Sequence, residues 1–358
     1  MSTKSNNDLK RAFTEDGELK THVGGQALLE GVMMRGRYNW SVAVRKTDGS
    51  LHVEEHDLPA KRARKGFMSW PFVRGCVALV ESLALGFKAL EIAGEHAFSD
   101  LTEQEKNDPE SEFQEAHPGQ SQNIEASFED DGEKDMGKGT MAVSMIAGVV
   151  LGVALFLIVP ALVTNLIVGE YDSNTIAWNV VDGILRVGVF IFYIWLIGHL
   201  SDIKRMFMYH GAEHKTIHCY EHGLPLTPEN ARSFPRLHVR CGTAFLIMVL
   251  ILAIIIYTII PVNAIIEGFG VPDGAPKLAL VIAVRILFLP VIAGISYEIT
   301  VKWAGSHPEN PIVKVILWPG LQMQYLTTND PDDHQLECAI EAMKRVLQRE
   351  EAEGKIAA

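Results

Sequence analysis

The sequence predicts a mainly α-helical, polytopic membrane protein with about four transmembrane helices and a small N-terminal α+β region in the cytoplasm. Its 358 residues are 48% hydrophobic and its mean hydropathy is positive, which is unusual for a soluble enzyme of ordinary charge content. The formal net charge of −12 is localised, because residues 100–135 hold 13 acidic residues against Lys106 and Lys134. Composition therefore favours membrane spans over an acidic soluble protein.

Residues 1–65 form the predicted N-terminal cytoplasmic region. Within it, residues 40–46 and 51–56 flank the turn-forming sequence Thr47-Asp48-Gly49-Ser50. Two short segments of alternating character on either side of such a turn predict a β-hairpin.

The glycine-rich segment before this hairpin, residues 23–36, invites comparison with a phosphate-binding loop. It lacks the Gly-Lys-Ser/Thr ending and the preceding apolar strand that such a loop requires. Four glycines together with Glu30 and Arg35 instead indicate a tight backbone packed near another element, and the functional site is one candidate for that element.

Residues 66–98 predict an amphipathic helix that lies on the membrane or on the helical bundle. A core helix of a small soluble domain is the alternative. The apolar positions at helical spacing are Val73, Val77, Val80, Ala84, Phe87 and Leu90.

Residues 99–138 form a predicted acidic linker. The segment has few large apolar residues and several Gly, Pro, Ser and Gln, so it cannot bury enough surface to offset the entropy of ordering it. We expect a disordered linker, and an acidic docking tail is the alternative.

The predicted membrane domain, residues 139–300, contains four stretches with little or no charge. They are residues 141–168, 183–200, 242–266 and 278–297. A helix needs roughly 20 residues to cross the hydrocarbon core. Arg186 lies one helical turn after Asp182, and the two side chains are expected to form an ion pair. Arg285 lies inside the last span, where a charge is costly and suggests a function, although a side chain reaching outward accounts for it equally well.

The distribution of basic residues predicts the orientation. The loop between spans two and three, residues 201–241, holds several lysines and arginines, whereas the two other loops between spans hold one lysine at most. Cationic loops stay in the cytoplasm. We therefore expect a multi-pass protein of the cell membrane with this loop, both termini and the C-terminal region, residues 301–358, in the cytoplasm.

Six of the 13 histidines fall between His199 and His238. If span two continues as a helix, His210, His214 and His218 follow at i, i+4 and i+8 and share one face. The sequence His-x-x-Glu-His at residues 210–214 matches the inverted zincin pattern, in which both histidines bind metal and Glu213 acts as the general base. A juxtamembrane helix with solvated histidines is the alternative.

Further polar groups fall at the same predicted membrane face. His238 and Cys241 stand where span three begins, and Glu298 stands where span four ends. We therefore expect a divalent metal, zinc, bound by His210, His214 and Glu298, with His218 or His238 as substitute ligands.

The four cysteines do not predict a disulfide framework. Cys76, Cys219, Cys241 and Cys338 form no C-x-x-C pair, and the polar start of the chain does not predict a signal peptide. Cys219 and Cys241 can bind zinc as thiolates, but isolated cysteines near a membrane are usually small apolar packing residues.

Several motifs resemble those of the YqhQ-like family of bacterial membrane proteins, and the likeness covers about residues 22–345. The motifs are residues 24–27, 30–36, 209–215, 235–243 and 297–298, followed by Pro319-Gly320-Leu321 and Leu326-Thr327-Thr328. The family is described as predicted metal-dependent enzymes, so the resemblance implies a metal and an enzymatic activity without naming a substrate.

Together these patterns predict a membrane-bound metal-dependent hydrolase that acts on a lipid-linked, peptide or other membrane-proximal substrate. A non-enzymatic metal-stabilised scaffold or carrier is the alternative. The expected partners are the lipid bilayer and an unknown membrane-proximal substrate, and no nucleic acid.

Overall fold

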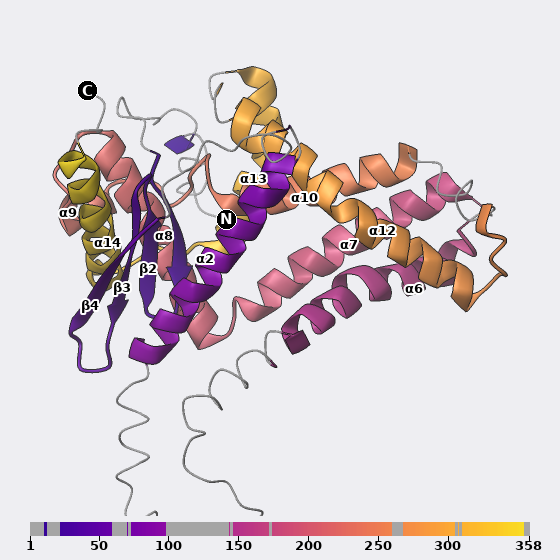
Figure 1. The fold of residues 1–358 in the computed structure, drawn as a ribbon, viewed down its shortest axis with the longest axis horizontal. Coiled ribbons are helices and arrows are strands. Elements are labelled where there is room, and N and C mark those ends of the chain that lie inside the picture. Colours follow the sequence, from indigo (N-terminus) through magenta and orange to yellow (C-terminus); the bar gives the residue numbers. More distant parts are fainter. Residues whose placement is uncertain are drawn as a thin grey trace, which may run out of the picture.

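The computed structural model describes residues 11–12, 22–58, 70, 73–97, 143, 146–171, 174–259, 268–304, 307 and 310–353. These residues form a lobe built on a β-sheet, beside which extends a bundle of long helices (Figure 1). The predicted acidic linker lies outside the described residues.

The sheet has four antiparallel strands in the order β1-β2-β3-β4. The strands are β1 (Gly24–Leu28), β2 (Gly31–Arg35), β3 (Asn39–Arg45) and β4 (Leu51–Asp57). The predicted hairpin is present as β3 and β4, which pair from Asn39 with Asp57 to Arg45 with Leu51. The glycine-rich segment, for which the sequence predicted only a tight backbone, forms a second hairpin whose turn contains Glu30 at φ 51°.

Helices cover both faces of this sheet. Side chains alternate between the two faces along each strand, so each strand contributes side chains to both helix–sheet contacts. One face packs on α2 (Val73–Ala97) through Trp40, Val42 and Val44 of β3. The opposite face packs on α8 (Ser201–Glu221) and α14 (Asp333–Ala352) through residues such as Met34 and Ala43. The lobe is therefore a three-layer arrangement with the sheet in the middle.

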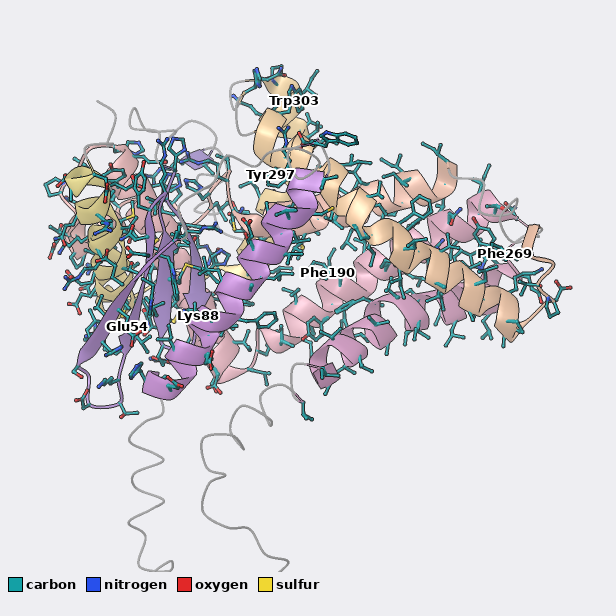
Figure 2. All side chains as sticks on the ribbon, viewed as in Figure 1. Glu54, Lys88, Phe190, Phe269, Tyr297 and Trp303 are labelled. Atoms are coloured by element: carbon teal, nitrogen blue, oxygen red, sulfur yellow. The ribbon has the colours of Figure 1, made fainter. Side chains whose placement is uncertain are left out.

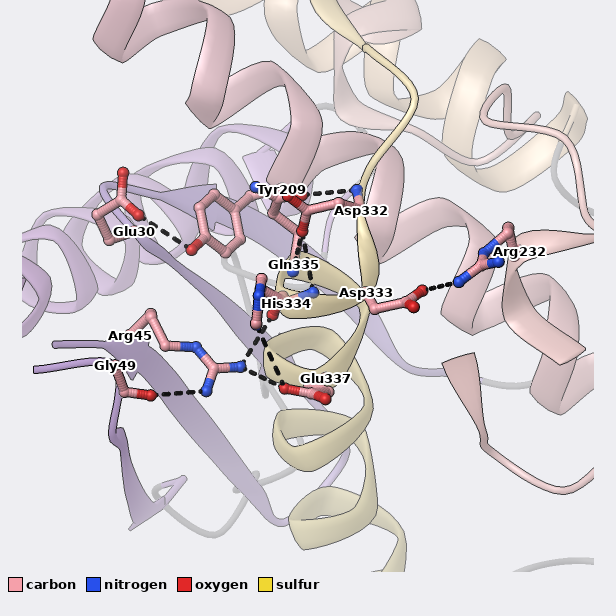
Figure 3. A network of polar contacts seen from close by, with 10 residues as sticks. All are labelled: Glu30, Arg45, Gly49, Tyr209, Arg232, Asp332, Asp333, His334, Gln335 and Glu337. Carbon is pink, nitrogen blue, oxygen red and sulfur yellow. Dashed lines mark hydrogen bonds and ion pairs between the residues drawn. The ribbon is translucent and has the colours of Figure 1, made fainter. Parts of the chain in front are cut away.

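Polar contacts fasten the start of α14 to its neighbours (Figure 3). Asp332 caps the helix in a capping box with Gln335. Arg45 of β3 donates to Glu337 at 2.7 Å and to the carbonyl of His334 at 3.1 Å, and Arg232, the last residue of α9 (Pro228–Arg232), pairs with Asp333. These contacts hold the C-terminal helix between the sheet and the loop that follows α8.

The burial of α2 differs from the simple amphipathic expectation. Its buried face consists mainly of small residues, namely Gly75, Gly86, Ala89, Ile92, Ala93 and Ala97. Three of the predicted apolar positions, Val80, Ala84 and Phe87, are exposed instead. The helix packs on the sheet and also on α12, so its small residues permit close contact while larger apolar side chains remain on the outside.

Three described helices are long and apolar enough to cross a membrane, judged by length and composition. They are Ile146–Val168, Thr175–Ile197 (α7) and Ala275–Thr300, whose first part is α12 (Ala275–Tyr297). The first contains a π-helical turn, Ala154–Ile158, before α6 (Val159–Val168). Pro160 explains this turn, since its ring excludes the α-helical hydrogen bond to residue 156.

The expected fourth span is only partly supported. The described helix α10 runs Gly242–Ile259, and residues 260–266 lie outside the described chain. At 1.5 Å per residue its 18 residues extend about 27 Å, which falls short of the roughly 30 Å hydrocarbon core. The count of membrane-length helices among the described residues is therefore three, with α10 as a shorter apolar helix that packs on α7, α12 and α13 (Pro311–Thr327).

Arg285 points into the bundle, which corrects the alternative that it reaches outward. Its side chain is 2% exposed, bonds to Asn179 and Asp182, and lies over the ring of Trp178 at 4.6 Å. Arg186 donates to Asp182 at 2.9 Å, as the sequence predicted. A polar core thus joins α7 to α12 inside the bundle.

Candidate metal centre

The histidine-rich helix α8 is separate from span two. α7 ends at Ile197, and α8 begins at Ser201 after Leu200 takes an extended conformation. The predicted continuous helix is therefore wrong, but the predicted spacing holds within α8. His210 and His214 lie one turn apart with their ring centroids 4.5 Å from each other.

Three side chains converge at this point. The ligand atoms of His210, His214 and Cys241 all lie within 4.8 Å of one another, and we call these residues the primary group. The Nε2 atom of His210 lies 3.2 Å from the Sγ atom of Cys241. Ligands of a tetrahedral zinc stand about 3.5 Å apart, given metal–ligand distances of about 2.0–2.3 Å. The primary group has close to the spacing that such an ion requires.

Backbone carbonyls fix the tautomer of both histidines. The Nδ1 atom of His210 lies 2.8 Å from the carbonyl oxygen of Thr327, and that of His214 lies 2.6 Å from the carbonyl oxygen of Arg236. A carbonyl only accepts, so each Nδ1 carries the proton and each Nε2 keeps its lone pair. This is the arrangement that supports metal-binding histidines in proteins. Within the part of the chain that the structure describes, no hydrogen-bond partner reaches the buried Nε2 of His214.

The electrostatics of the primary group suit metal binding. Burial lowers the pKa of His214 to about 4, so its imidazole is neutral near pH 7. Burial raises the pKa of the Cys241 thiol, but His214 and hydrogen bonds from Thr243 outweigh burial and leave that pKa below its ordinary value. Metals bind neutral imidazole and thiolate, so both shifts favour the ligating forms.

Glu213 lies next to the primary group and is 6% exposed. Burial raises its pKa to about 7, against the opposing effects of His210 and of the backbone N–H of Gly25 on β1. A Cβ on Gly25 would stand 2.8 Å from the Cγ and Cδ atoms of Glu213. The glycine-rich segment therefore packs against the candidate site.

The loop after α8 is held by α13. Gln324, which is fully buried, accepts from the N–H of His238 at 2.8 Å and donates to the carbonyl of His238 at 2.9 Å. Arg236 donates to the carbonyl of Thr328 at 2.8 Å. These contacts, which the sequence did not predict, position Cys241 opposite α8. The sequence alone suggested no role for the Leu326-Thr327-Thr328 motif. In the structure, the carbonyl of Thr327 orients His210 and the carbonyl of Thr328 accepts from Arg236.

The expected substitute ligands form a second, deeper group. His218, Glu221 and His238 also have ligand atoms within 4.8 Å of one another, and we call them the inner group. The Nδ1 atom of His238 accepts from the N–H of Arg240 at 3.3 Å, so Nε2 carries the proton and faces Glu221 at 3.6 Å. Arg240 also pairs with Glu221. His238 and Glu221 thus belong to a buried ion-pair network. His218 directs Nε2 to the carbonyl oxygen of Leu237 at 2.9 Å and keeps the lone pair of Nδ1.

Glu298 is not part of either group among the described residues. Its carboxylate faces Arg74 of α2, with Oε1 2.7 Å from the guanidinium Nε atom and Oε2 bonded to Nη2. An arginine holding both oxygens leaves the carboxylate engaged in a bidentate pair. Cys241, weighed from the sequence as a packing residue, occupies the place expected for Glu298.

Comparison with known proteins agrees with the motif resemblance. The family described as "Protein of unknown function (DUF1385)" matches residues 70–349. The chain belongs to this DUF1385 family. It is 32% identical over 332 residues to "Uncharacterized protein YqhQ" of Bacillus subtilis (strain 168), covering 91% of this chain and 92% of that protein. No solved structure matches the chain. The DUF1385 match includes both histidine groups, and neither description names an activity.

Proposed function

We propose that the chain is a membrane-bound, metal-dependent enzyme, a hydrolase, whose metal is held by His210, His214 and Cys241. The observation that carries this proposal is the convergence of these three ligand atoms from α8 and the start of α10, with both imidazole tautomers set by backbone carbonyls. Two imidazoles and one thiolate are a donor set that suits zinc. Three protein ligands leave a fourth position for substrate or water, as in catalytic rather than structural zinc sites.

The chemistry follows from the bound ion and its neighbour. A divalent metal, when bound, supplies a Lewis acid that polarises a carbonyl or phosphoryl oxygen and makes water more acidic. Glu213, with a pKa of about 7, can accept a proton and return it at neutral pH, which is the property of a general base. The backbone N–H of Gly25 holds its carboxylate in place.

Three helices of membrane length support a location in the cell membrane. We infer a site on the cytoplasmic side from the basic residues around α8, with both termini on the same side. The primary group lies outside the helices of membrane length, whereas a carrier is expected to place its ligands near the bilayer midplane. A membrane-proximal substrate fits this position better than a transported ion does.

Metal analysis of the detergent-purified protein tests the ligand set. We expect about one tightly bound divalent metal per chain in the wild type and in Glu213→Gln, and loss of that metal in His214→Ala. His334→Ala is the matched control, because the His334 side chain is 75% exposed. Wild-type protein without bound metal after purification and after zinc addition would refute the proposal.

A cellular test separates the enzyme from a metal-stabilised scaffold. Each variant replaces the wild-type gene, and the phenotype of a deletion is the readout. We expect Glu213→Gln and His214→Ala to behave like the deletion, because the first removes the base and the second the metal. If Glu213→Gln behaves like the wild type while His214→Ala does not, the scaffold interpretation holds instead.

A further inference from the structure

A separate cluster of imidazoles lies on the face of the sheet that α2 covers. His52, Glu54 and His56 alternate along β4, so all three side chains point to the same face. His96 reaches them from the last turn of α2. α8 and the primary group lie across the sheet, so this cluster is a separate place in the fold. Figure 2 marks it by Glu54 on β4, near the end of α2 that follows Lys88.

The distances within the cluster are short. The Oε1 atom of Glu54 lies 2.8 Å from Nε2 of His52 and 3.3 Å from Nε2 of His96. The ligand atoms of these three residues all lie within 4.8 Å of one another. The rings of His52 and His96 are stacked with centroids 3.7 Å apart. Two imidazole nitrogens and one carboxylate oxygen, drawn from two different elements, therefore meet at one point. Without an ion the carboxylate accepts from both Nε2–H groups, so an ion that binds here replaces these two protons and each ring keeps its proton on Nδ1 instead.

His56 orients the carboxylate. Its Nε2 atom lies 3.0 Å from Oε2 of Glu54, the oxygen that does not face His52 and His96. The His56 ring in turn stacks on Trp40 with centroids 4.4 Å apart. Such outer partners fix the direction of a ligating carboxylate. The arrangement resembles a ligand set with its supporting contact already in place.

The exposure of the cluster distinguishes it from the primary group. The side chains of His52 and His96 are each 26% exposed, and that of Glu54 is 31% exposed. Water can therefore pair with each Nδ1–H once Nε2 binds an ion, and an ion can enter and leave without opening of the fold. This accessibility is typical of an exchangeable site.

We propose that His52, Glu54 and His96 form a second, exchangeable binding site for a divalent transition metal of the zinc class. Imidazole and carboxylate are the donors that zinc takes besides thiolate. The ion would join the end of α2 to the outer strand of the sheet. His56 is a positioning residue that acts through Glu54. The proposal does not depend on the primary group binding metal.

Zinc titration against a chromophoric chelator tests the site in the full-length, detergent-purified protein. The background carries His210→Ala and His214→Ala, so that failure of the proposed function leaves this measurement readable. We expect one zinc to bind in that background, more than about tenfold weaker binding after His52→Gln or His96→Gln, and about tenfold weaker binding after His56→Gln. His334→Gln is the matched control and should change nothing. Equal affinity in His52→Gln and His334→Gln would overturn the assignment.

A measurement on the wild type keeps the proposal testable if the background variant does not fold. Diethyl pyrocarbonate modifies accessible imidazoles, and mass spectrometry locates the modified residues. We expect zinc to protect His52 and His96 while His334 remains reactive. Undiminished modification of His52 and His96 at zinc concentrations that saturate the protein would overturn the proposal.

Discussion

The Nε2 atom of His210 lies 3.2 Å from the Sγ atom of Cys241, although 31 residues separate them in the chain. One stands near the middle of a polar helix and the other at the start of an apolar one. The side-chain amide of Gln324 on α13 forms two hydrogen bonds with the backbone of His238 in the connecting loop. These bonds hold the loop so that the contact can form. The candidate metal centre is therefore assembled by three elements, of which only α8 carries a motif with a metal-binding pattern.

The ligand set predicts opposite results for Cys241 and Glu298. Cys241→Ser should weaken metal binding by more than about 100-fold, because even the partners behind metal ligands are worth 10–100-fold. Glu298→Gln should keep the metal, since its carboxylate is held by Arg74. Metal content after dialysis against a weak chelator measures both. Metal loss in Glu298→Gln with retention in Cys241→Ser would restore the ligand set expected from sequence.

Gln324 should affect metal binding without being a ligand. Gln324→Ala leaves the buried N–H and C=O of His238 without this partner, at about 1–3 kcal/mol for each group left unsatisfied. We expect a lower midpoint of thermal unfolding and 10–100-fold weaker metal binding. Gln348→Ala, on the exposed side of α14, is the control and should match the wild type in both measurements. Unchanged affinity in Gln324→Ala would show that the loop keeps its position without this contact.

Gly211 should not tolerate a side chain. A Cβ at Gly211 would stand 2.0 Å from the carbonyl oxygen of Asn329, which is backbone and cannot move aside cheaply. Gly211→Ala should therefore destabilise the fold by roughly 1–3 kcal/mol, the usual cost of overpacking. Gly94→Ala in α2 is the matched control, because nothing lies within 4 Å of its Cβ position. That variant should gain about 0.5–1 kcal/mol from helix propensity. The midpoints of thermal unfolding of both variants test this prediction. Equal midpoints would contradict the close approach of Gly211 to the carbonyl of Asn329.

Glu213 should make the metal-free protein less stable as pH rises. Its pKa is about 7 in the native state and 4.5 ordinarily, so between these values the native state holds a proton that the unfolded state has lost. The stabilising contribution is present in full below pH 4.5 and is lost as pH rises through 7, by about 3 kcal/mol in total. Glutamine does not titrate. The stability of the wild type relative to Glu213→Gln should therefore fall from pH 4.5 to 7.5, and a constant difference would contradict the raised pKa.

The sequence by itself determined the features that depend on local pattern. Uncharged stretches predicted the long helices, because a helix in lipid must satisfy its backbone internally and present apolar side chains. The turn at residues 47–50 predicted the β3–β4 hairpin, and the spacing of His210 and His214 predicted their shared helix face. Each of these follows from interactions between residues close together in the chain.

Only the tertiary structure decided which groups meet. The carboxylate of Glu298 forms a bidentate pair with Arg74 and does not join the histidines. The hydrogen bonds between Gln324 and His238 help to place Cys241 beside them. The role of the glycine-rich segment follows from the close approach of Gly25 on β1 to Glu213 on α8. These contacts depend on packing between segments that are far apart in the chain. A single arginine or buried amide there decides which side chains meet, and the pattern of neighbouring residues does not reveal it.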